Sequence, residues 1–420
     1  MGKPTPPAAP LQIAEAVARI LAEVRPLEPV KRPLLDAYNS VLAADAVAPV
    51  TLPPWDNSAM DGYAVRAADI TRVPASLRVI ESVAAGQFPS RTVGAGEATV
   101  IMTGAPLPKG ADTVVRVEDT DGGTTTVEIR DARDAGKNVR PRGEDIVEGH
   151  VAIAAGTPLG AAQIGVLASL GFAEVDVVRA PRVAILTSGD ELVELDRFSE
   201  VRAGKKIVSS NSYTLRALVR AAGAEPVYLG IARDTPDALR ALLERARECD
   251  AIITSAGISV GEHDYLRDVL AQMGADMKFW RVRMRPGAPI GFGLVDGKPW
   301  IGLPGNPVST MVTFELFARP AIYKMCGRRR LFRRPVPVVL GERVTLAAEL
   351  THFLRAVVTV RDGQRTAVLT GPQSSGILTS MSNANALLIV PADRLTVEAG
   401  ETLHAILIGD DADLASDFVL

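Results

Sequence analysis

The chain has 420 residues, of which 47% are hydrophobic and 23% are charged, and its 46 basic and 49 acidic residues give a formal net charge of −3. This length exceeds a single ordinary core and predicts roughly three domains. The near balance of charge argues against bulk affinity for nucleic acid or for an anionic membrane surface.

The cysteine content and the N-terminal sequence bear on location. Two cysteines and four histidines are too few for a disulfide framework and leave little for a zinc site. The N-terminus lacks the charged-then-apolar layout of a signal peptide, and no run approaches the ~20 apolar residues of a membrane span. We therefore expect a cytoplasmic protein in a reducing compartment.

The first 180 residues change texture twice. After a Pro-rich leader, residues 11–24 place apolar side chains at helical spacing, which predicts an amphipathic helix. Residues 45–140 consist of short apolar runs broken by Gly, Pro and Asp, and predict a small β domain. Residues 151–172 return to helical spacing. We expect the first and third segments to pack together, with the β domain inserted between them.

From residue 181 the chain alternates between strand and helix patterns, as in a sheet with helices on both faces. Strands are expected at 182–187, 226–231, 251–254 and 300–303, and helices at 210–223, at 234–246, around Leu266, Val269, Leu270 and Met273, and from about 307. After the basic run at 328–334 the texture is β again, with a turn at Asp362-Gly363.

Polar residues follow four of these strands. Glu191 lies in TSGDEL, Asp234 follows the next strand, Asp264 lies in TSAGISVGEHDY, and LPGNPVS leaves the fourth strand. Ligands of open α/β sheets bind beyond the carboxyl ends of the strands, so these exits are expected to share one crevice. Carboxylates from separate loops suit Mg²⁺. For each acid alone, a helix cap or a solvated turn is the alternative.

The loop after the third strand is rich in glycine and serine. Its residues Ser255, Gly257, Ser259 and Gly261 have the composition to wrap a phosphate at a helix N-terminus. A tight turn with Asp264 as the helix cap is the alternative.

Three arginines alternate in the segment RVRMRPG. In an extended chain Arg281, Arg283 and Arg285 point to one side. Their guanidinium groups suit phosphate or another oxyanion. The alternative is a solvated edge strand protected by positive charge.

Eight segments occur in an order that is typical of one family. They are PPWDNSAMDGYAVR, IMTGAPLPKGADTVVRVED, NVRPRGEDI, LTSGDEL, the SNxxxL segment at 210–215, SAGISVGEHDY, RMRPGAPIGFG and LPGNPVS. On these segments the sequence resembles the molybdopterin molybdenumtransferase family, which includes bacterial MoeA and the E domains of Cnx1 and gephyrin.

The resemblance implies an α/β multidomain fold. Residues 8–50 and 138–178 would form a discontinuous, extended helical domain, and residues 51–137 an inserted β domain. Residues 179–330 would form a doubly wound α/β domain similar to MogA, and residues 331–420 a C-terminal domain like a β-barrel.

The resemblance also implies a reaction, in which molybdate is inserted into adenylylated molybdopterin with release of AMP. Glu191, Asp234 and Asp264 would hold Mg²⁺ or order a water molecule, and Arg281 and Arg285 would handle the oxyanion. The residues implied to bind the pterin nucleotide are Ser255, Gly257, Ser259, Gly261, Pro304, Gly305, Asn306, Arg355 and Ser375.

The family is homodimeric, which implies an active site between protomers. Asp61 and Thr103 would reach it from the β insertion of the other protomer. The expected partners are the pterin nucleotide and other proteins of molybdenum cofactor biosynthesis, without nucleic acid or membrane.

Four departures and two alternatives accompany this interpretation. Ala256 replaces a usual glycine and Ala288 a common lysine of the family, and Arg281 and Arg285 occupy positions that are often lysine there. Tungstate is chemically close to molybdate and could be the oxyanion instead. The α/β domain alone also fits a MogA-like adenylyltransferase, which makes the adenylylated intermediate. A scaffold that binds peptides, as gephyrin does, is the alternative from another class.

Overall fold

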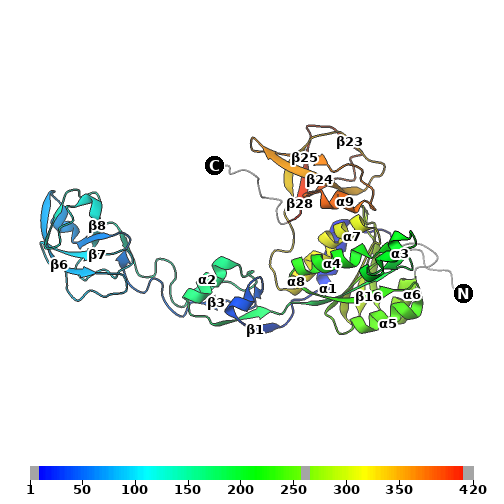
Figure 1. Cartoon of the computed structure of the whole chain (residues 1–420), viewed down its shortest axis with the longest axis horizontal. Coiled ribbons are helices and arrows are strands. Elements are labelled where there is room, and N and C mark those ends of the chain that lie inside the picture. The colour runs from blue at the N-terminus through cyan, green and yellow to red at the C-terminus, as the bar shows by residue number, and fades with distance from the viewer. Residues whose placement is uncertain (1–8, 257–264, 410–420) are drawn as a thin grey trace. The chain divides into compact units, whose positions relative to one another are not determined.

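The computed structural model describes residues 9–256 and 265–409 (Figure 1). The chain forms two compact units. Unit 1 comprises the residues up to 43, residues 156–160 and the chain from 174 onwards, and unit 2 comprises residues 44–155 and 161–173. The finer division into four parts, with the boundaries given above, remains a prediction.

Unit 2 contains a five-stranded sheet in the order β8-β5-β7-β6-β9. Its strands are β5 (Gly62–Val65), β6 (Ala75–Val83), β7 (Glu97–Ile101), β8 (Thr113–Arg116) and β9 (Thr126–Ile129), with short 3₁₀ turns at Ala67–Ile70 and Val117–Asp119. Neighbouring residues of β5 lie in separate apolar clusters, Tyr63 and Val65 in one and Ala64 in the other. The short apolar runs therefore form a β domain, as their texture predicts.

The remainder of unit 2 consists of short elements. They are β3 (Ala46–Val47), β4 (Asn57–Ser58), β10 (Val139–Arg140), β11 (Val151–Ile153) and α2 (Ala161–Ser169). The prediction of a helix across 151–172 was wrong in its first half, which forms the strand β11 and then a turn where Gly156 has a left-handed φ of 77°. The helix begins only at Ala161.

Unit 1 contains a six-stranded sheet in the order β16-β13-β17-β21-β20-β18. The strands are β13 (Arg182–Ser188), β16 (Glu225–Ala232), β17 (Ala251–Ser255), β18 (Asp276–Arg281), β20 (Pro289–Val295) and β21 (Lys298–Leu303). Strands β16, β13, β17 and β21 run parallel, and β20 and β18 complete the sheet in antiparallel pairs.

Helices cover both faces of this sheet. They are α4 (Ser210–Ala221), α5 (Pro236–Ala246), α6 (Tyr265–Gln272) and α7 (Pro307–Thr313). Val183 and Ile185 of β13 lie in a core with α4 and α7, whereas Ala184 and Leu186 lie in a core with α5 and α6. Both faces of β13 are apolar because both are covered, which confirms the predicted doubly wound sheet.

The strand order reverses at β13. The chain passes from β13 through α4 to β16 on one side, and then through α5 to β17 on the other side. The carboxyl ends of β13 and β17 therefore flank a topological switch point, where open α/β sheets bind ligands.

Other elements of unit 1 precede or extend the sheet. The segment between β13 and α4 contains four short elements: β14 (Leu192–Val193), a 3₁₀ turn (Leu195–Arg197), α3 (Phe198–Arg202) and β15 (Ile207–Val208). Further along the chain, α7 continues through a π-helical turn (Phe314–Ala318) into α8 (Arg319–Met325). The predicted first helix, α1 (Ile13–Glu23), buries Ala16 and Ile20 in the same core as α8.

A small sheet joins residues from both sides of unit 2 in the sequence. It consists of β1 (Pro29–Pro33), β12 (Glu174–Val178) and β2 (Val41–Leu42). A 3₁₀ turn (Leu34–Ala37) lies between β1 and β2 in the sequence. Strand β1 pairs with β12 over its full length. The chain before the β insertion thus pairs with the chain after it. The expected packing of residues 11–24 with residues 151–172 stays a prediction, because α1 belongs to unit 1 and α2 to unit 2.

The C-terminal strands close into a barrel, coloured orange to red in Figure 1. They are β22 (Val336–Leu340), β24 (Thr351–Arg361), β25 (Gln364–Leu369), β26 (Ala386–Val390) and β28 (Thr402–Leu407), with the short β23 (Val344–Thr345), β27 (Thr396–Val397) and α9 (Leu378–Ser382) beside them. Pairing of β24 with β26 completes the ring, and closure removes the unpaired edges. The predicted barrel-like domain is confirmed.

One short strand links the α/β sheet region to the barrel. The short β19 (Met284–Arg285) pairs in parallel with the start of β24, so the arginine segment joins the barrel. The predicted turn at Asp362-Gly363 lies between β24 and β25, and both residues have positive φ.

Within the described ranges no helix is long and apolar enough to cross a membrane. Cys249 and Cys326 are free and buried.

Candidate active site

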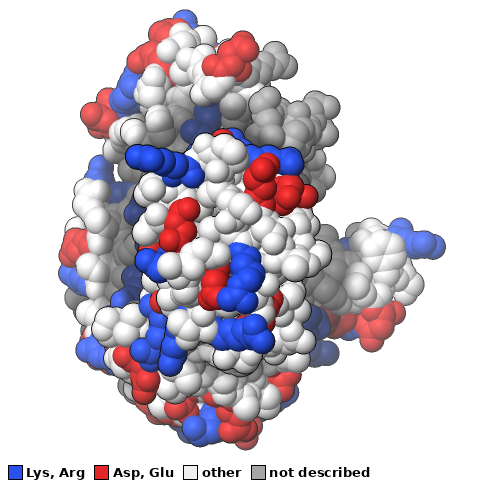
Figure 2. All heavy atoms as spheres, turned by 90° about the vertical axis from the view of Figure 1, so that its left-hand side faces the viewer, with Lys and Arg blue, Asp and Glu red and all other residues white. Residues whose placement is uncertain are grey.

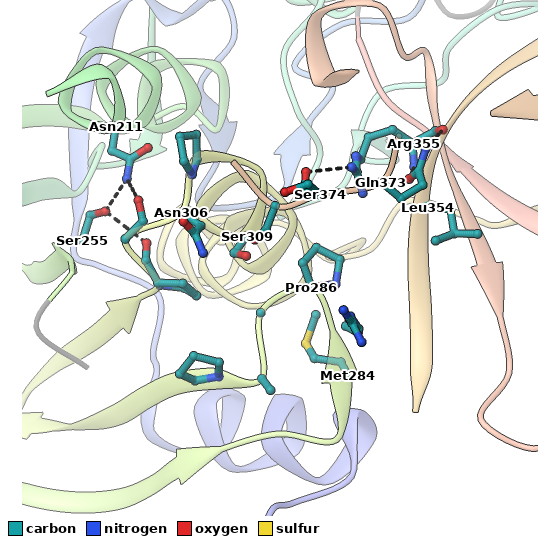
Figure 3. Close-up of a pocket in the computed structure, with 18 of the residues that line it drawn as sticks. Asn211, Ser255, Met284, Pro286, Asn306, Ser309, Leu354, Arg355, Gln373 and Ser374 are labelled. Carbon is teal, nitrogen blue, oxygen red and sulfur yellow. Dashed lines mark hydrogen bonds between the residues drawn. The ribbon is translucent and has the colours of Figure 1, made fainter. Parts of the chain in front are cut away.

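A cavity of about 1170 Å³ lies at the switch point of the α/β sheet. One wall holds the residues that follow β13, β17 and β21, and the other holds β24 and the loop around Gln373 (Figure 3). Three of the four strand exits that the sequence singled out therefore open into one cavity.

A hydrogen-bond network fixes the α/β wall (Figure 3). Ser255 is buried at the end of β17, and its hydroxyl donates to the carbonyl oxygen of Pro304 at 3.2 Å. The amide nitrogen of Asn211, in the first turn of α4, donates to the Ser255 Oγ at 2.9 Å and to the Gly305 carbonyl oxygen at 2.7 Å. These contacts hold two strand exits and one helix start together.

The loop after β21 ends in a helix start. Asn306 caps α7 through its backbone, since its carbonyl oxygen accepts from the Thr310 N–H at 2.9 Å, and Pro307 occupies the first turn. The Thr310 hydroxyl donates to the Pro304 carbonyl at 2.6 Å. Pro304, Gly305 and Asn306 all line the cavity; their role in ligand binding, which the resemblance implies, stays a prediction.

Arg355 dominates the barrel wall. It lies on β24 with 0% of its surface exposed. Its Nε donates to the Ser380 hydroxyl at 3.0 Å and its Nη2 to the Ser374 carbonyl at 3.0 Å, whereas its Nη1 is buried with no acceptor among the described residues. Burial lowers the pKa of this guanidinium below its ordinary value.

The chemistry of Arg355 follows from this isolation. In the part of the chain that the structure describes, no carboxylate forms an ion pair with it. A buried cation without a counter-charge is costly, and a guanidinium fork matches an oxyanion. Ser375 lines the cavity beside it and is held to α7, since the Val308 N–H donates to its carbonyl at 3.1 Å.

The three alternating arginines separate in the fold. All are exposed, and the residues between them, Val282 and Met284, are buried, as alternation predicts. Arg281 ends β18 in the α/β sheet and does not line the cavity, whereas Arg285 lies in β19 and does. The segment divides because its two ends pair with different sheets.

The predicted metal ligands follow two strand ends. Glu191 lines the cavity, and its carboxylate lies against Gly189, where a Cβ would come within 2.7 Å of it. Asp234 does not line the cavity; its carboxylate accepts from the Asp190 N–H at 3.3 Å, and its own N–H donates to the Asp190 carboxylate at 3.4 Å.

The predicted phosphate loop falls largely beyond the described residues. Gly257, Ser259, Gly261 and Asp264 lie outside them, so their roles stay predictions. Residues 9–256 and 265–409 contain no group of three His, Cys, Asp or Glu side chains that could hold a metal ion. The three-acid Mg²⁺ site, which includes Asp264, therefore also stays a prediction.

Asp61 and Thr103 form a local pair in unit 2. The backbone N–H and the hydroxyl of Thr103 both donate to the Asp61 Oδ1 at 2.7 Å. These bonds hold the pKa of Asp61 below its ordinary value, the backbone bond contributing most. The pair presents an exposed carboxylate in its charged form; its contribution to the cavity stays a prediction.

Three family models match successive parts of the chain. The model of the MoeA N-terminal region (domain I and II) matches residues 11–171, that of a probable molybdopterin binding domain matches 184–324, and that of the MoeA C-terminal region (domain IV) matches 337–408. The molybdopterin molybdenumtransferase 2 of Mycobacterium tuberculosis is 39% identical over 92% of this chain and 97% of its own length. The chain belongs to the MoeA family.

Other MoeA proteins agree with this assignment. The molybdopterin molybdenumtransferase of Staphylococcus aureus is 34% identical over 96% of this chain and 97% of its own. The crystal structure of the molybdopterin biosynthesis MoeA protein of Pyrococcus horikoshii OT3 superimposes with a TM-score of 0.83 at 29% identity, covering 95% of this chain and 100% of that one. Membership places the chain among the transferases of molybdenum cofactor biosynthesis.

The cavity of this MoeA protein also contains residues that sequence reasoning did not assign. Asn211 lies inside a quoted motif, but its position near a helix start suggests only a cap. Gln373 accepts from the Arg355 backbone N–H at 2.8 Å and donates to its carbonyl oxygen at 3.2 Å. His352 is buried, its Nε2 lies 3.0 Å from the Ala348 carbonyl oxygen, and burial lowers its pKa. No local pattern marks the last two.

The charged surface agrees with the balanced composition. Figure 2 shows basic and acidic side chains interspersed, with uncharged residues between them, on the face that it presents. This face has no single-sign patch of the kind that nucleic acid selects.

Proposed function

We propose that this MoeA protein inserts molybdate into adenylylated molybdopterin, with release of AMP and dependence on Mg²⁺. The observation that carries the proposal is the buried, unpaired guanidinium of Arg355 on the wall of the cavity. Its free Nη1 is a donor that an oxyanion satisfies. Arg285, at the same cavity, adds a second positive charge.

The opposite wall would receive the nucleotide and its phosphates. It lies at the switch point, and it presents Ser255 and the loop of Pro304, Gly305 and Asn306. The volume of about 1170 Å³ exceeds the 300–1,000 Å³ that is typical of small-molecule sites, which suits a pterin nucleotide together with an oxyanion. Holding both substrates in one cavity would supply the positioning that the transfer needs.

The acids at the strand exits suit a hard cation. Asp190 and Asp234 bond to each other's backbone, and Glu191 follows Asp190 directly. Glu191 and Asp234, with Asp264, would hold Mg²⁺ through carboxylate oxygens, the donors that this ion prefers. Bound there, Mg²⁺ would neutralise charge on the adenylyl phosphate.

The remaining features of the proposal concern the assembly. We propose a cytoplasmic homodimer in which Asp61 and Thr103 of one protomer complete the site of the other. The bonded pair presents a carboxylate in its charged form, ready to contact a group outside its own unit. Other proteins of molybdenum cofactor biosynthesis would deliver and collect the pterin.

The test is AMP release by the purified protein from adenylylated molybdopterin, with molybdate, with tungstate and with no oxyanion. Release that depends on Mg²⁺ and on an oxyanion is expected. Synthesis of the adenylylated intermediate from ATP and molybdopterin would instead indicate an adenylyltransferase.

The metal site has its own variant. We expect Asp264→Asn to abolish Mg²⁺-dependent AMP release and to leave the dimer intact in size-exclusion chromatography, because the amide removes the negative charge that attracts the ion. Unchanged AMP release would remove Asp264 from the metal site.

A further inference from the structure

Asn211 is a buried polar side chain of the α/β wall, and it braces two strand ends. It is 9% exposed, and it reaches from α4 to the ends of two strands. Its amide nitrogen uses both hydrogens, one toward the Ser255 Oγ at 2.9 Å and one toward the Gly305 carbonyl oxygen at 2.7 Å.

The orientation of the amide group is fixed by chemistry. The Gly305 carbonyl oxygen can only accept a hydrogen bond, so the atom that faces it must be the nitrogen of Asn211. The Oδ1 therefore points away from both partners, as Figure 3 shows. It is buried, and no donor among the described residues reaches it.

This Oδ1 belongs to a residue that lines the cavity. Native proteins rarely leave a buried acceptor unsatisfied, and such an atom at a binding site commonly awaits a partner from outside the chain. The Ser255 hydroxyl of this wall is used within the protein, toward Pro304. The Thr254 hydroxyl is also buried without a partner among the described residues, but Thr254 does not line the cavity, whereas Asn211 does.

We propose that the Oδ1 of Asn211 is a substrate-binding acceptor, which takes a hydrogen bond from an amino or hydroxyl group of the pterin nucleotide. The inference rests on the proposed function for the identity of the ligand. Both halves of that ligand carry such donors, in the pterin amine and in the adenine amine and ribose hydroxyls. The ionised oxygens of phosphate and molybdate accept rather than donate, so in their fully ionised forms these groups cannot be the partner of this atom.

The experiment compares Asn211→Ala with the unchanged protein in calorimetric titrations, first with AMP and then with molybdopterin. We expect affinity to fall about ten-fold for the ligand whose donor meets Oδ1, the loss typical of one hydrogen bond in a buried site. A loss with AMP alone places the nucleotide there, and a loss with molybdopterin alone places the pterin.

A control variant distinguishes the loss of ligand binding from the loss of structural support for the loop. Thr310 supports the same loop through Pro304 but does not line the cavity, so Thr310→Val loosens the loop and leaves the Oδ1 in place. We expect both variants to lower the melting temperature and only Asn211→Ala to weaken binding ten-fold. Equal losses of affinity in the two variants, or no loss in Asn211→Ala, would overturn the assignment. Failure of the unchanged protein to bind either ligand would count against the proposed function instead.

Discussion

At the scale of single residues, the guanidinium of Arg355 is held in one orientation by groups of its own chain. The carbonyl oxygen of Ser374 and the hydroxyl of Ser380 orient its guanidinium, and neither neutralises it. The charge is thus fixed in place at the cavity wall, and under the proposed function an oxyanion would meet a donor that needs no reorganisation.

Replacing Arg355 with lysine tests this geometry. A lysine keeps the charge but cannot contact Ser374, Ser380 and an oxyanion with one planar fork. We expect the KM for molybdate in AMP release to rise roughly ten-fold or more, since bonds to charged groups are among the strongest. Arg365→Lys, at an exposed position of β25, is the matched control and should leave KM unchanged. An unaltered KM in Arg355→Lys would contradict the oxyanion role.

Ala256 illustrates a departure whose physical meaning the structure supplies. Its φ is 78°, in the left-handed region that disfavours a Cβ. Glycine, which has no Cβ, adopts this region without the strain. A Cβ added at Gly305 would lie 3.3 Å from the Cβ of Ala256. Both residues could therefore have a Cβ only if the backbone shifted slightly.

The strain at Ala256 predicts the sign of a substitution. Ala256→Gly should leave the free energy of unfolding unchanged or raise it by up to about 1 kcal/mol, because relief of strain offsets the added freedom of the unfolded chain. Ala217→Gly, in the exposed middle of α4, should lower it by about 0.5–1 kcal/mol. Urea denaturation measures both. A loss at Ala256 equal to that at Ala217 would rule out the strain.

At the scale of elements, an ionic cluster holds the end of the β insertion. Asp119, at the end of a 3₁₀ turn, accepts from Arg133 Nε at 2.8 Å and from Arg116 Nη2 at 3.0 Å, while Arg116 Nε donates to Asp134 at 3.0 Å. The hydrogen bond from Arg133 holds the pKa of Asp119 below its ordinary value. The cluster joins residues on either side of β9.

This cluster predicts a pH dependence. Because the folded-state pKa of Asp119 is depressed, its contribution to stability is complete above the unfolded pKa of about 3.9 and is lost as pH falls through the folded pKa. In Asp119→Asn we expect lower stability at neutral pH and a shallower decline below about pH 4. Denaturation with urea at pH 3 and pH 6 measures this. Parallel declines in the two proteins would contradict the assignment.

The elements also show what a single sequence reveals. Apolar periodicity predicted α1, α4, α5 and α6 together with the four parallel strands of the α/β sheet, because each buries a regular stripe or face. It did not mark β18 and β20 as strands. The span 151–172 failed in its first half because a short apolar run such as Val151–Ile153 fits a strand as well as a helix, and here it forms β11. Likewise, alternation placed the three arginines on one side but gave no sign that β18 and β19 join different sheets.

At the scale of the whole molecule, the proposed site needs two copies of the chain. Asp61 and Arg355 would act in the same site from different protomers. Asp61→Asn and Arg355→Lys should therefore each be strongly impaired alone and should complement each other when mixed.

Mixing gives a quantitative test. After equal amounts of the two variants exchange subunits, half of the dimers carry one intact site, so activity should recover to about a quarter of the unmutated value. Size-exclusion chromatography with light scattering checks the dimer. Mixing without recovery, while exchange is shown to occur, would place both residues in one protomer or remove one from the site.

The sequence alone determined the four parallel strands of the α/β sheet with their helices, and the β texture of the insertion and of the C-terminal part, because these depend on local periodicity. Its short ordered segments determined the family resemblance, which implied the doubly wound sheet and the barrel. Only the tertiary structure decided that Arg355 is buried unpaired beside the crevice of another sheet, and that Asn211 spans to Ser255 and Gly305, which are 44 and 94 residues away. Such contacts depend on how the strands of the sheet and of the barrel pair. Pairing brings together residues that are far apart in sequence, and the local sequence around each residue does not indicate its partner.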